Sequence, residues 1–526
     1  MLKKISLFLF ASFLCCGLFA QSTTGFVTYD ISDLQTGSKS KKITEYLGSD
    51  DKGGNYFLKE NIGWSTDAFF LDLFGKNLTL QKEAELPLKW DKLTVSLLRV
   101  LNLNDHFYLF AYDRDSKTDI GTVYLQEIDR ATFTFKGKAK PIVTKQMANN
   151  QFGGFSVITS ENDSYIAVVG NLNQKGNDFE QIDVTVFDST MQKVWSKEIK
   201  LPYTEKLFWI QSRQLDRKGN FYVLGKNYFD KAVDKKKGEP NYNFRIIAYK
   251  ENGNKIKDLK IEVADKFINT IWMSPMNDGS KLLCGGFYSA KGTYSIKGVI
   301  MLTIDLENLS IESNKSKPFD SELLNRLVTT KKESKTGELF EYDITDFIKR
   351  SDGGFLLIGE QSYIVTHTYT DGNGNTHTTT TYHYNNLILV NINPELDIEW
   401  IKDIPKQQVG PYLPQSYALS ISNGNLYFLF NQSTKQEKMY ATDGKMEDKT
   451  LGEEEENDKS SQKESQVLVA VKVEPDGTRY SQKLWKYEYG KMCSIEPAYC
   501  EQVNENEMFF YGSQPGKYQI GFFYFK

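Results

Sequence analysis

Three of the four histidines in this chain lie within one short polar stretch. The segment THTYTDGNGNTHTTTTYHY, residues 366–384, contains His367, His377 and His383. Imidazole nitrogens are common protein ligands of zinc, copper and nickel, so the segment is a candidate metal site. The β-branched threonines on both sides of the DGNGN turn predict a long hairpin, and its register decides how the three rings are placed.

We expect the turn of this hairpin to centre on Asn373. Tyr369 then faces His377 across the two strands, and Tyr363 faces His383. All three histidines share one side of the hairpin in this register, whereas a slip of one residue would separate them. The register therefore decides whether a metal can bind.

The predicted hairpin does not bring three ligands together. His367 and His377 are diagonal neighbours, close enough to share a transition metal. His383 lies about 20 Å farther along the strand than His377, and Asp371 at the tip is not part of a carboxylate pair. We therefore expect no metal and no cofactor, leave His367 and His377 as the metal candidates, and interpret the hairpin as an exposed arm that contacts a partner.

The elements that must position this hairpin belong to an eightfold repeat. A strand that usually follows a turn of Asn, Asp and Gly recurs about every 50 to 80 residues, and a second apolar strand such as NLILVNIN, 386–393, comes after it each time. Further strand-like segments precede and follow most pairs, so the unit is four antiparallel strands, A to D. The first strands are GNYFLKE (54–60), HFYLFAY (106–112), SYIAVVGN (164–171), NFYVLGK (220–226), KLLCGGF (281–287), GFLLIGE (354–360), NLYFLFN (425–431) and EMFFYGS (507–513).

Four-stranded sheets repeated at such a period are the signature of a β-propeller, and the chain resembles the β-propeller superfamily over essentially its mature length. The last repeat ends at the C-terminus without a strand D, and GFVTYDISDL, 25–34, is a strand without a repeat. We therefore predict an all-β propeller of eight blades closed by this N-terminal strand, with seven blades as the alternative. The glycine-histidine/tryptophan-aspartate signature and the Ser-x-Asp-x-Gly-x-x-Trp box are absent, so no family's function carries over.

Extra loop length is predicted on one face of the propeller. The B–C and D–A connections of a blade emerge on this face, called the loop-rich face below, and the short A–B and C–D turns on the other, called the tight-turn face. A helix, SELLNRLVTT, capped by Asp320 or Ser321, is expected in the longest D–A link. The insertions fall at about 227–242, 315–339, 361–385 and 432–466, and the acidic part of the last one, 443–466, is expected to be a solvated loop rather than a calcium site.

Loops on a rigid scaffold are where binding groups accumulate, so we expect a ligand or partner on the loop-rich face. Residues near the start of each strand A should border the channel mouth there, where aromatic and charged groups can stack on and hydrogen-bond a sugar or a peptide; the alternative is that several of them pack between blades. With the hairpin residues, the predicted binding set is Trp209, Arg213, Tyr342, Asp343, His367, Tyr369, His377, Tyr417 and Tyr499.

The N-terminus indicates the cellular compartment, and the composition limits the kinds of partner. Residues 1–20 form a predicted secretory signal peptide, so we expect export to the periplasm or cell surface; a lipid anchor on Cys15 or Cys16 is the alternative. No later apolar run is long enough to span a bilayer, and the net charge of −4 gives no attraction to nucleic acid. We expect residues 21–526 to form a single propeller domain.

No local motif for catalysis is present. The chain lacks a Gly-x-Ser-x-Gly elbow, a phosphate loop, a Cys/His nucleophile pair and a redox Cys-x-x-Cys. We therefore predict a non-catalytic propeller that binds a protein or glycan partner through the loop-rich face. The alternative is a glycoside hydrolase or polysaccharide lyase with carboxylates contributed by different blades, which leave no local pattern.

Overall fold

The computed structural model describes residues 25–526 apart from 37–40, 62–67, 91–92, 148–153, 172–178, 237–238, 277, 290–294, 329–337, 411–415, 434–439, 441–442 and 447–465. The predicted signal peptide with Cys15 and Cys16 lies outside the described residues, as does most of the acidic segment. The part of the chain that the structure describes holds no helix long and apolar enough to cross a membrane.

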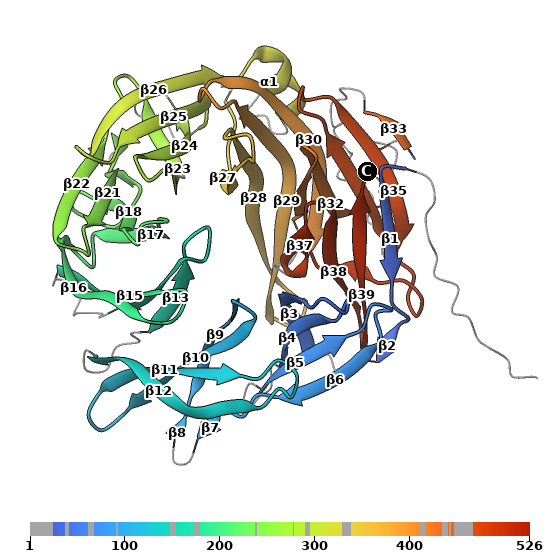
Figure 1. The fold of residues 1–526 in the computed structure, drawn as a ribbon. Coiled ribbons are helices and arrows are strands. Elements are labelled where there is room, and N and C mark those ends of the chain that lie inside the picture. Colours follow the sequence, from blue (N-terminus) through green and yellow to red (C-terminus); the bar gives the residue numbers. More distant parts are fainter. Residues whose placement is uncertain are drawn as a thin grey trace, which may run out of the picture.

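Eight antiparallel sheets follow one another around a ring, with strand A innermost and strand D outermost (Figure 1). The protein is thus an eight-bladed β-propeller, as predicted. Blade 1 consists of β3 (Lys41–Ser49), β4 (Asn55–Asn61), β5 (Ala68–Phe74) and β6 (Leu80–Glu85). Blade 2 consists of β9 (Ser96–Leu103), β10 (His106–Asp115), β11 (Ile120–Ile128) and β12 (Phe135–Gln146). Blade 3 consists of β13 (Phe155–Thr159), β14 (Tyr165–Asn171), β15 (Phe179–Asp188) and β16 (Lys193–Thr204). The short β7 (Lys89–Trp90) and β8 (Leu93–Thr94) form a hairpin between blades 1 and 2.

The second half of the ring carries the insertions. Blades 4 and 5 are β17 (Phe208–Leu215), β18 (Phe221–Tyr228), β21 (Tyr242–Lys250) and β22 (Lys255–Ile261), then β23 (Phe267–Pro275), β24 (Lys281–Ser289), β25 (Gly298–Asp305) and β26 (Ser310–Pro318). Blades 6 and 7 are β27 (Tyr342–Lys349), β28 (Phe355–Thr370), β29 (Thr376–Ile392) and β30 (Ile398–Gly410), then β31 (Ala418–Ser422), β32 (Asn425–Ser433), β34 (Gln466–Val473) and β35 (Arg479–Lys486).

The N-terminal strand closes the ring. Blade 8 contains β36 (Ser494–Ile495), a 3-10 turn η2 (Pro497–Tyr499), β37 (Glu501–Asn504), β38 (Glu507–Gln514) and β39 (Lys517–Phe525). β1 (Val27–Ile31) pairs antiparallel with β39, and the short β2 (Gln35–Thr36) continues along it. The prediction that the N-terminal strand supplies the missing strand D is therefore confirmed, and β39 is not left as an open edge.

The hydrophobic core lies between neighbouring blades. Central strands such as β24 are buried on both faces, whereas outer strands such as β26 alternate exposed and half-buried residues. One core cluster joins Tyr222 and Leu224 of blade 4 to Ile271 and Met273 of blade 5. Each sheet thus buries its apolar faces against the next sheet, which explains why the pattern must repeat around a closed ring.

The predicted helix is present in the link between blades 5 and 6. α1 (Ser321–Leu327) begins at Asp320, whose carboxylate accepts a hydrogen bond from the Leu323 amide at 2.7 Å. Leu323 and Leu327 of this helix are buried. Arg326 fixes the helix to blade 6 through an ion pair with Asp403 at 3.1 Å.

The blade 7 insertion starts differently from the prediction of a solvated loop. Residues Asp443–Lys445 form β33, which pairs with β35 at the outer edge of blade 7, and Met446 is buried. The buried Met446 and the backbone pairing with β35 hold residues 443–446 in place. The prediction was based on the high charge of the segment, which does not reveal either contact. The prediction for 447–465 lies outside the described residues.

Candidate functional site

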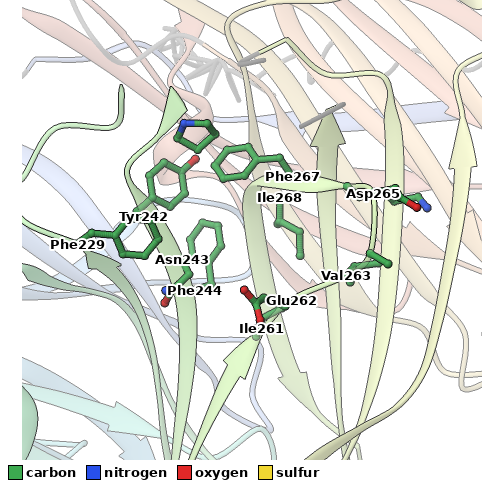
Figure 2. A pocket seen from close by; sticks show the side chains of 13 residues that line it. Phe229, Tyr242, Asn243, Phe244, Ile261, Glu262, Val263, Asp265, Phe267 and Ile268 are labelled. Atoms are coloured by element: carbon green, nitrogen blue, oxygen red, sulfur yellow. The ribbon is translucent and has the colours of Figure 1, made fainter. Parts of the chain in front are cut away.

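A cavity opens on the loop-rich face in the seam between blades 4 and 5. Its volume is about 550 Å³, and the start of β21, the end of β22 and the start of β23 form its walls (Figure 2). Phe229 and Pro240 from the blade 4 insertion complete the rim. Glu262, Asp265 and Lys266 are the charged residues of the lining, so most of the cavity wall is apolar or aromatic.

A chain of aromatic rings leads from the inner strand β17 to this cavity. Trp209, on the inner strand β17, is 60% exposed and meets Tyr228 edge to face, with 6.1 Å between ring centroids. Tyr228 contacts Tyr242 at 6.0 Å, and Tyr242 contacts Phe267 at 5.1 Å, both edge to face. Such contacts fix the rings in preferred orientations. We call Trp209, Tyr228, Tyr242, Phe267 and the exposed Phe229 the aromatic path.

The blade 4 insertion is held against the aromatic path by partly buried polar contacts. Asp234 accepts hydrogen bonds from Lys226 Nζ at 2.6 Å and from the Tyr228 hydroxyl at 2.8 Å. The Asn241 side chain donates to the carbonyl of Lys231 at 2.7 Å. Lys226 Nζ also lies 3.7 Å from the centroid of Tyr242, a close cation–π contact. These contacts join the described part of the insertion to blade 4, and β19 (Lys235–Lys236) and β20 (Glu239–Pro240) form its small hairpin.

Two further predicted residues, Asp343 and Arg213, lie on inner strands. Asp343, on the inner strand β27, is exposed, yet desolvation raises the pKa of its carboxyl while the charge of Lys226 lowers it. Arg213 donates from Nη2 to Asn171 at 2.7 Å in the seam between blades 3 and 4.

A carboxyl group near Arg213 has an unusual pKa. Burial, with the charge of Glu205 as the second cause, raises the pKa of Glu180 to about 7, and Arg213 partly opposes this. Groups that titrate near neutral pH are able to donate or accept protons in catalysis. Nothing in the sequence around Glu180 marks it, because its neighbours come from two other segments.

The remaining predicted tyrosines pack between blades. Tyr342 is buried, and the hydroxyl of Tyr417 contacts Thr345 Oγ1 at 2.5 Å and hydrogen-bonds to Asp346 of blade 6. Tyr499 meets Tyr511 edge to face at 5.9 Å within blade 8. Unlike Trp209, none of these three is an exposed aromatic side chain, and a binding role for them stays a prediction.

The histidine hairpin has the predicted register. β28 and β29 pair Tyr369 with His377 and Tyr363 with His383, and the rings of each pair stack at 5.2 Å and 4.5 Å. His367 pairs with Thr379 on the same side. His377 Nε2 is 2.9 Å from Asp371 Oδ2.

No group of three or more metal-ligating side chains occurs among the residues that the structure describes. His377 is engaged by a carboxylate and an aromatic ring, and His383 by an aromatic ring. The geometry therefore favours an aromatic arm over a three-ligand metal centre. Metal binding by His367 and His377 remains to be measured.

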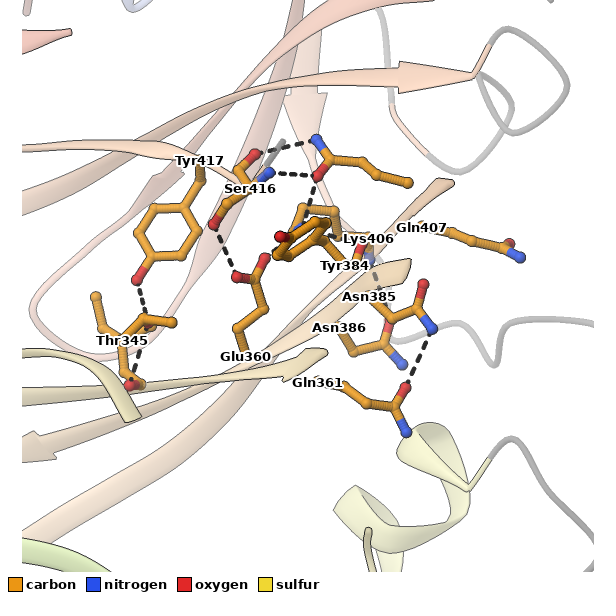
Figure 3. Close-up of polar contacts among 12 residues, drawn as sticks. Thr345, Glu360, Gln361, Tyr384, Asn385, Asn386, Lys406, Gln407, Ser416 and Tyr417 are labelled. Carbon is orange, nitrogen blue, oxygen red and sulfur yellow. Dashed lines mark hydrogen bonds and ion pairs between the residues drawn. The ribbon is translucent and has the colours of Figure 1, made fainter. Parts of the chain in front are cut away.

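A buried polar network lies at the base of this hairpin (Figure 3). Lys406 of β30 and Glu360 of β28 form an ion pair at 2.6 Å, with side chains 0% and 3% exposed. Lys406 Nζ also donates to the Tyr384 carbonyl at 3.1 Å, and Ser416 Oγ donates to Glu360 at 2.8 Å. Desolvation lowers the pKa of Lys406, and the charge of Glu360 opposes this. Asn386 Oδ1 accepts from the Lys406 amide at 3.0 Å.

The tight-turn face has a cavity of its own, of about 450 Å³, lined by the ends of the inner strands of blades 3 to 6. Trp272 on β23 lines it and is 42% exposed. Arg217 and Glu161 form an ion pair across it at 3.1 Å. Sequence reasoning did not find this cavity, because four separate repeats contribute its walls.

The three cysteines in the described part, Cys284, Cys493 and Cys500, are free thiols. Burial raises the pKa of Cys493 to about 11 and that of Cys500 to about 12. Neither thiol has the low pKa of a reactive cysteine.

No protein-family model and no curated protein matches this chain. Among solved structures, the WD40 domain of SCAP from fission yeast is similar at 9% identity and a TM-score of 0.39, covering 94% of each chain. Prolyl oligopeptidase B from Galerina marginata is similar at 10% identity and a TM-score of 0.36, and the match covers 77% of this chain and 48% of the peptidase. A prolyl endopeptidase is similar at 10% identity and a TM-score of 0.33, and the match covers 80% of this chain and 54% of that enzyme. The chain thus spans about half the length of these peptidases. At such low scores the fold assignment depends on the observed ring of eight blades.

Proposed function

We propose that this protein is an exported, non-catalytic propeller that binds a protein partner on its loop-rich face. The aromatic path carries the proposal: two of its members, Trp209 and Phe229, are 60% and 55% exposed, and it ends in a cavity of about 550 Å³. Exposed aromatic anchors beside a preformed pocket are typical of protein interfaces, where one or two inserted side chains supply most of the binding energy.

The composition of the pocket supports a protein side chain over a sugar ring. Sugars present several hydroxyl groups and need several convergent polar partners. Among the lining residues, Phe229 is exposed and Val263 and Phe267 are half-buried, whereas Tyr242, Phe244 and Ile268 are buried. An apolar or aromatic side chain of a partner fills such a cavity at the lowest desolvation cost.

The test compares substitutions on the two faces. Proteins of the native cell envelope are captured with the wild type and with Trp209→Ala, Phe229→Asp and Trp272→Ala. We expect the first two changes to reduce recovery of the same partner at least about tenfold, as substitution of an interface anchor does. Trp272→Ala is the matched control, because it removes an exposed tryptophan from the tight-turn face.

Equal recovery with all variants would refute the proposed role of the aromatic path. Recovery of polysaccharide instead of protein would assign the face to a glycan. Export is tested on the same material, since cleavage of the predicted signal peptide leaves Gln21 as the first residue.

A glycan-active enzyme is the second candidate, and the observation that favours it is the raised pKa of Glu180 beside Glu205 and Arg213. A carboxyl group of this kind can serve as a general acid in glycoside hydrolysis. The test is depolymerisation of envelope polysaccharides by the wild type and by Glu180→Gln. Activity that the substitution lowers at least about a hundredfold would establish the enzyme.

A further inference from the structure

The hairpin of blade 6 has an open strand edge where it leaves the propeller. β27 pairs with β28 only as far as Tyr342 opposite Gln361, and the Ser362 amide makes the next contact, to the Glu341 carbonyl at 2.8 Å. β28 then continues to Thr370, and in the described part of the chain β29 is its one neighbour there. Among the described residues, no strand therefore lies beside one side of β28 for eight residues, 363–370.

Alternate residues of β28 point their backbone groups toward this open side. The Ser362 N–H points away from β29, toward the β27 side. At the turn, the Asp371 N–H points toward β29, to the Asn375 carbonyl at 2.9 Å. The pairing is regular from Ser362 to Thr370, so even-numbered residues face outward. Ile364, Thr366 and Thr368 thus present N–H and C=O groups at the open edge.

This edge lacks the charges that protect the other edges of the propeller. β28 from Ser362 to Thr370 and β29 from Thr376 to Asn386 contain no Lys, Arg, Asp or Glu. Natural proteins place charges, especially lysine, on open edges to prevent pairing with other chains. The outer strands of the ring follow this rule: Lys136, Lys138, Lys140 and Lys145 in β12, Lys193, Lys197 and Lys200 in β16, Lys255, Lys257 and Lys260 in β22, and Lys315 and Lys317 in β26.

We propose that an extended segment of the protein partner adds as a strand to the open edge of β28 between residues 363 and 370. This inference rests on the proposed function and names the mode of binding. The added strand continues the line of β27, whose pairing with β28 ends at Gln361. Only an extended backbone repeats donors and acceptors every two residues, as this edge requires.

Side chains beside the edge indicate the composition of the added strand. On one face Ile364 is 61% exposed and lies next to threonines. On the other face Tyr363 and Tyr369 are held by their stacks with His383 and His377. Neither face offers a counter-charge on β28, so a partner strand of uncharged β-branched and aromatic residues fits best.

Proline substitutions test the β28 edge and the β29 edge of the hairpin independently. Thr368 and Thr378 face each other across the hairpin as a pair whose backbone groups do not bond to each other. The N–H group of each residue therefore points away from the other strand, toward its own open edge. Thr368→Pro removes a donor from the β28 edge, and Thr378→Pro removes the equivalent donor from the β29 edge. The two variants are matched in residue type, position in the hairpin and cost to the hairpin's own pairing.

The measurement is capture of the envelope partner by the wild type and both variants, followed by amide hydrogen exchange of the wild-type complex. We expect Thr368→Pro to lower recovery at least about tenfold and Thr378→Pro to lower it less than about twofold. We also expect partner binding to slow exchange of the Ile364, Thr366 and Thr368 amides, and not that of Thr378.

Equal recovery with both proline variants, or no protection of the three β28 amides, would overturn strand addition. If Trp209→Ala and Phe229→Asp still abolish capture in that case, the proposed function stands without it. If no substitution on the loop-rich face changes capture, both proposals fail.

Discussion

β28 and β29 change character along their length, and the comparison of their two halves shows how this propeller combines a fixed frame with an exposed arm. Within blade 6, residues 355–361 and 385–392 are buried, and the strands are rich in Leu, Ile and Val. Outside it, the same two strands are exposed or half-buried and consist mainly of Thr, Tyr and His. Both halves keep one antiparallel ladder with a single register shift at Glu360–Ser362.

The change occurs at the buried network around Lys406 and Glu360. A buried ion pair costs desolvation and is weak evidence for stability, but removing one partner leaves an unpaired charge in the core. Here the pair joins β30 to β28 at the position where the ladder shifts register. The inner half therefore depends on specific partners, whereas the outer half depends on local pairing alone.

The largest expected effect follows from breaking the ion pair. Glu360→Ala leaves Lys406 without its carboxylate, and we expect the free energy of unfolding to fall by about 3–5 kcal/mol. Urea denaturation of the purified protein measures it. Glu360→Leu combined with Lys406→Met should restore most of the loss, because both charges are then absent. A loss below about 1 kcal/mol for Glu360→Ala would show that water replaces the missing partner.

Shortening the arm should cost far less. Replacing residues 364–382 by Asn-Gly closes a two-residue turn on the pair Tyr363–His383, whose backbone groups face each other. We expect the free energy of unfolding to change by less than about 1 kcal/mol, because the removed residues are mostly exposed, while partner capture is lost. A large loss of stability would mean that the arm packs on the propeller.

A smaller effect is expected at the tip of the arm. The hydrogen bond from His377 is the largest cause that lowers the pKa of Asp371, to about 2. His377→Ala should raise the pKa of Asp371 toward its ordinary value of about 4. Because the folded-state pKa is lowered, the contact stabilises the tip above about pH 4 and is lost as the pH falls toward 2. NMR titration of the Asp371 carboxyl carbon measures both values.

The smallest expected effect is metal uptake. His377 is engaged by Asp371 and Tyr369, and the described residues contain no three-ligand group. We expect less than about 0.1 equivalent of zinc, copper or nickel in the purified protein by elemental analysis. One equivalent of metal that is lost in His367→Ala would restore the histidine pair as a metal site.

Local patterns predicted much of the arm and the frame. The period of the strand pairs gave eight blades, and the turn residues gave the pairing of Tyr369 with His377, because both depend on residues close in sequence. The apolar stripe and cap of α1 were predicted for the same reason. The prediction of a solvated loop was wrong at the start of the segment, where β33 pairs with β35 of blade 7.

The candidate site was only partly predictable. Trp209 was expected at the channel mouth; it lies on the inner strand β17 and is exposed, but the chain of ring contacts through Tyr228 and Tyr242 to a cavity was not expected. Tyr342 and Tyr417 were expected at the corresponding position, but Tyr342 is buried and Tyr417 is half-buried against the core of blades 6 and 7. Position in a strand says which side a residue faces, and it does not say how closely the next blade approaches.

The sequence by itself determined the repeat, the closing strand, the register of the histidine hairpin and the absence of charge along it, because these follow from side-chain period, turn chemistry and composition. Only the tertiary structure decided which seam opens into a cavity, which carboxyl groups lose water, and which backbone groups of β28 face an empty edge. Those features arise where separate repeats meet, as Lys406 meets Glu360 and Trp209 meets Tyr228. Contacts between distant segments leave no local pattern, since the residues that form them are adjacent only after the ring has closed.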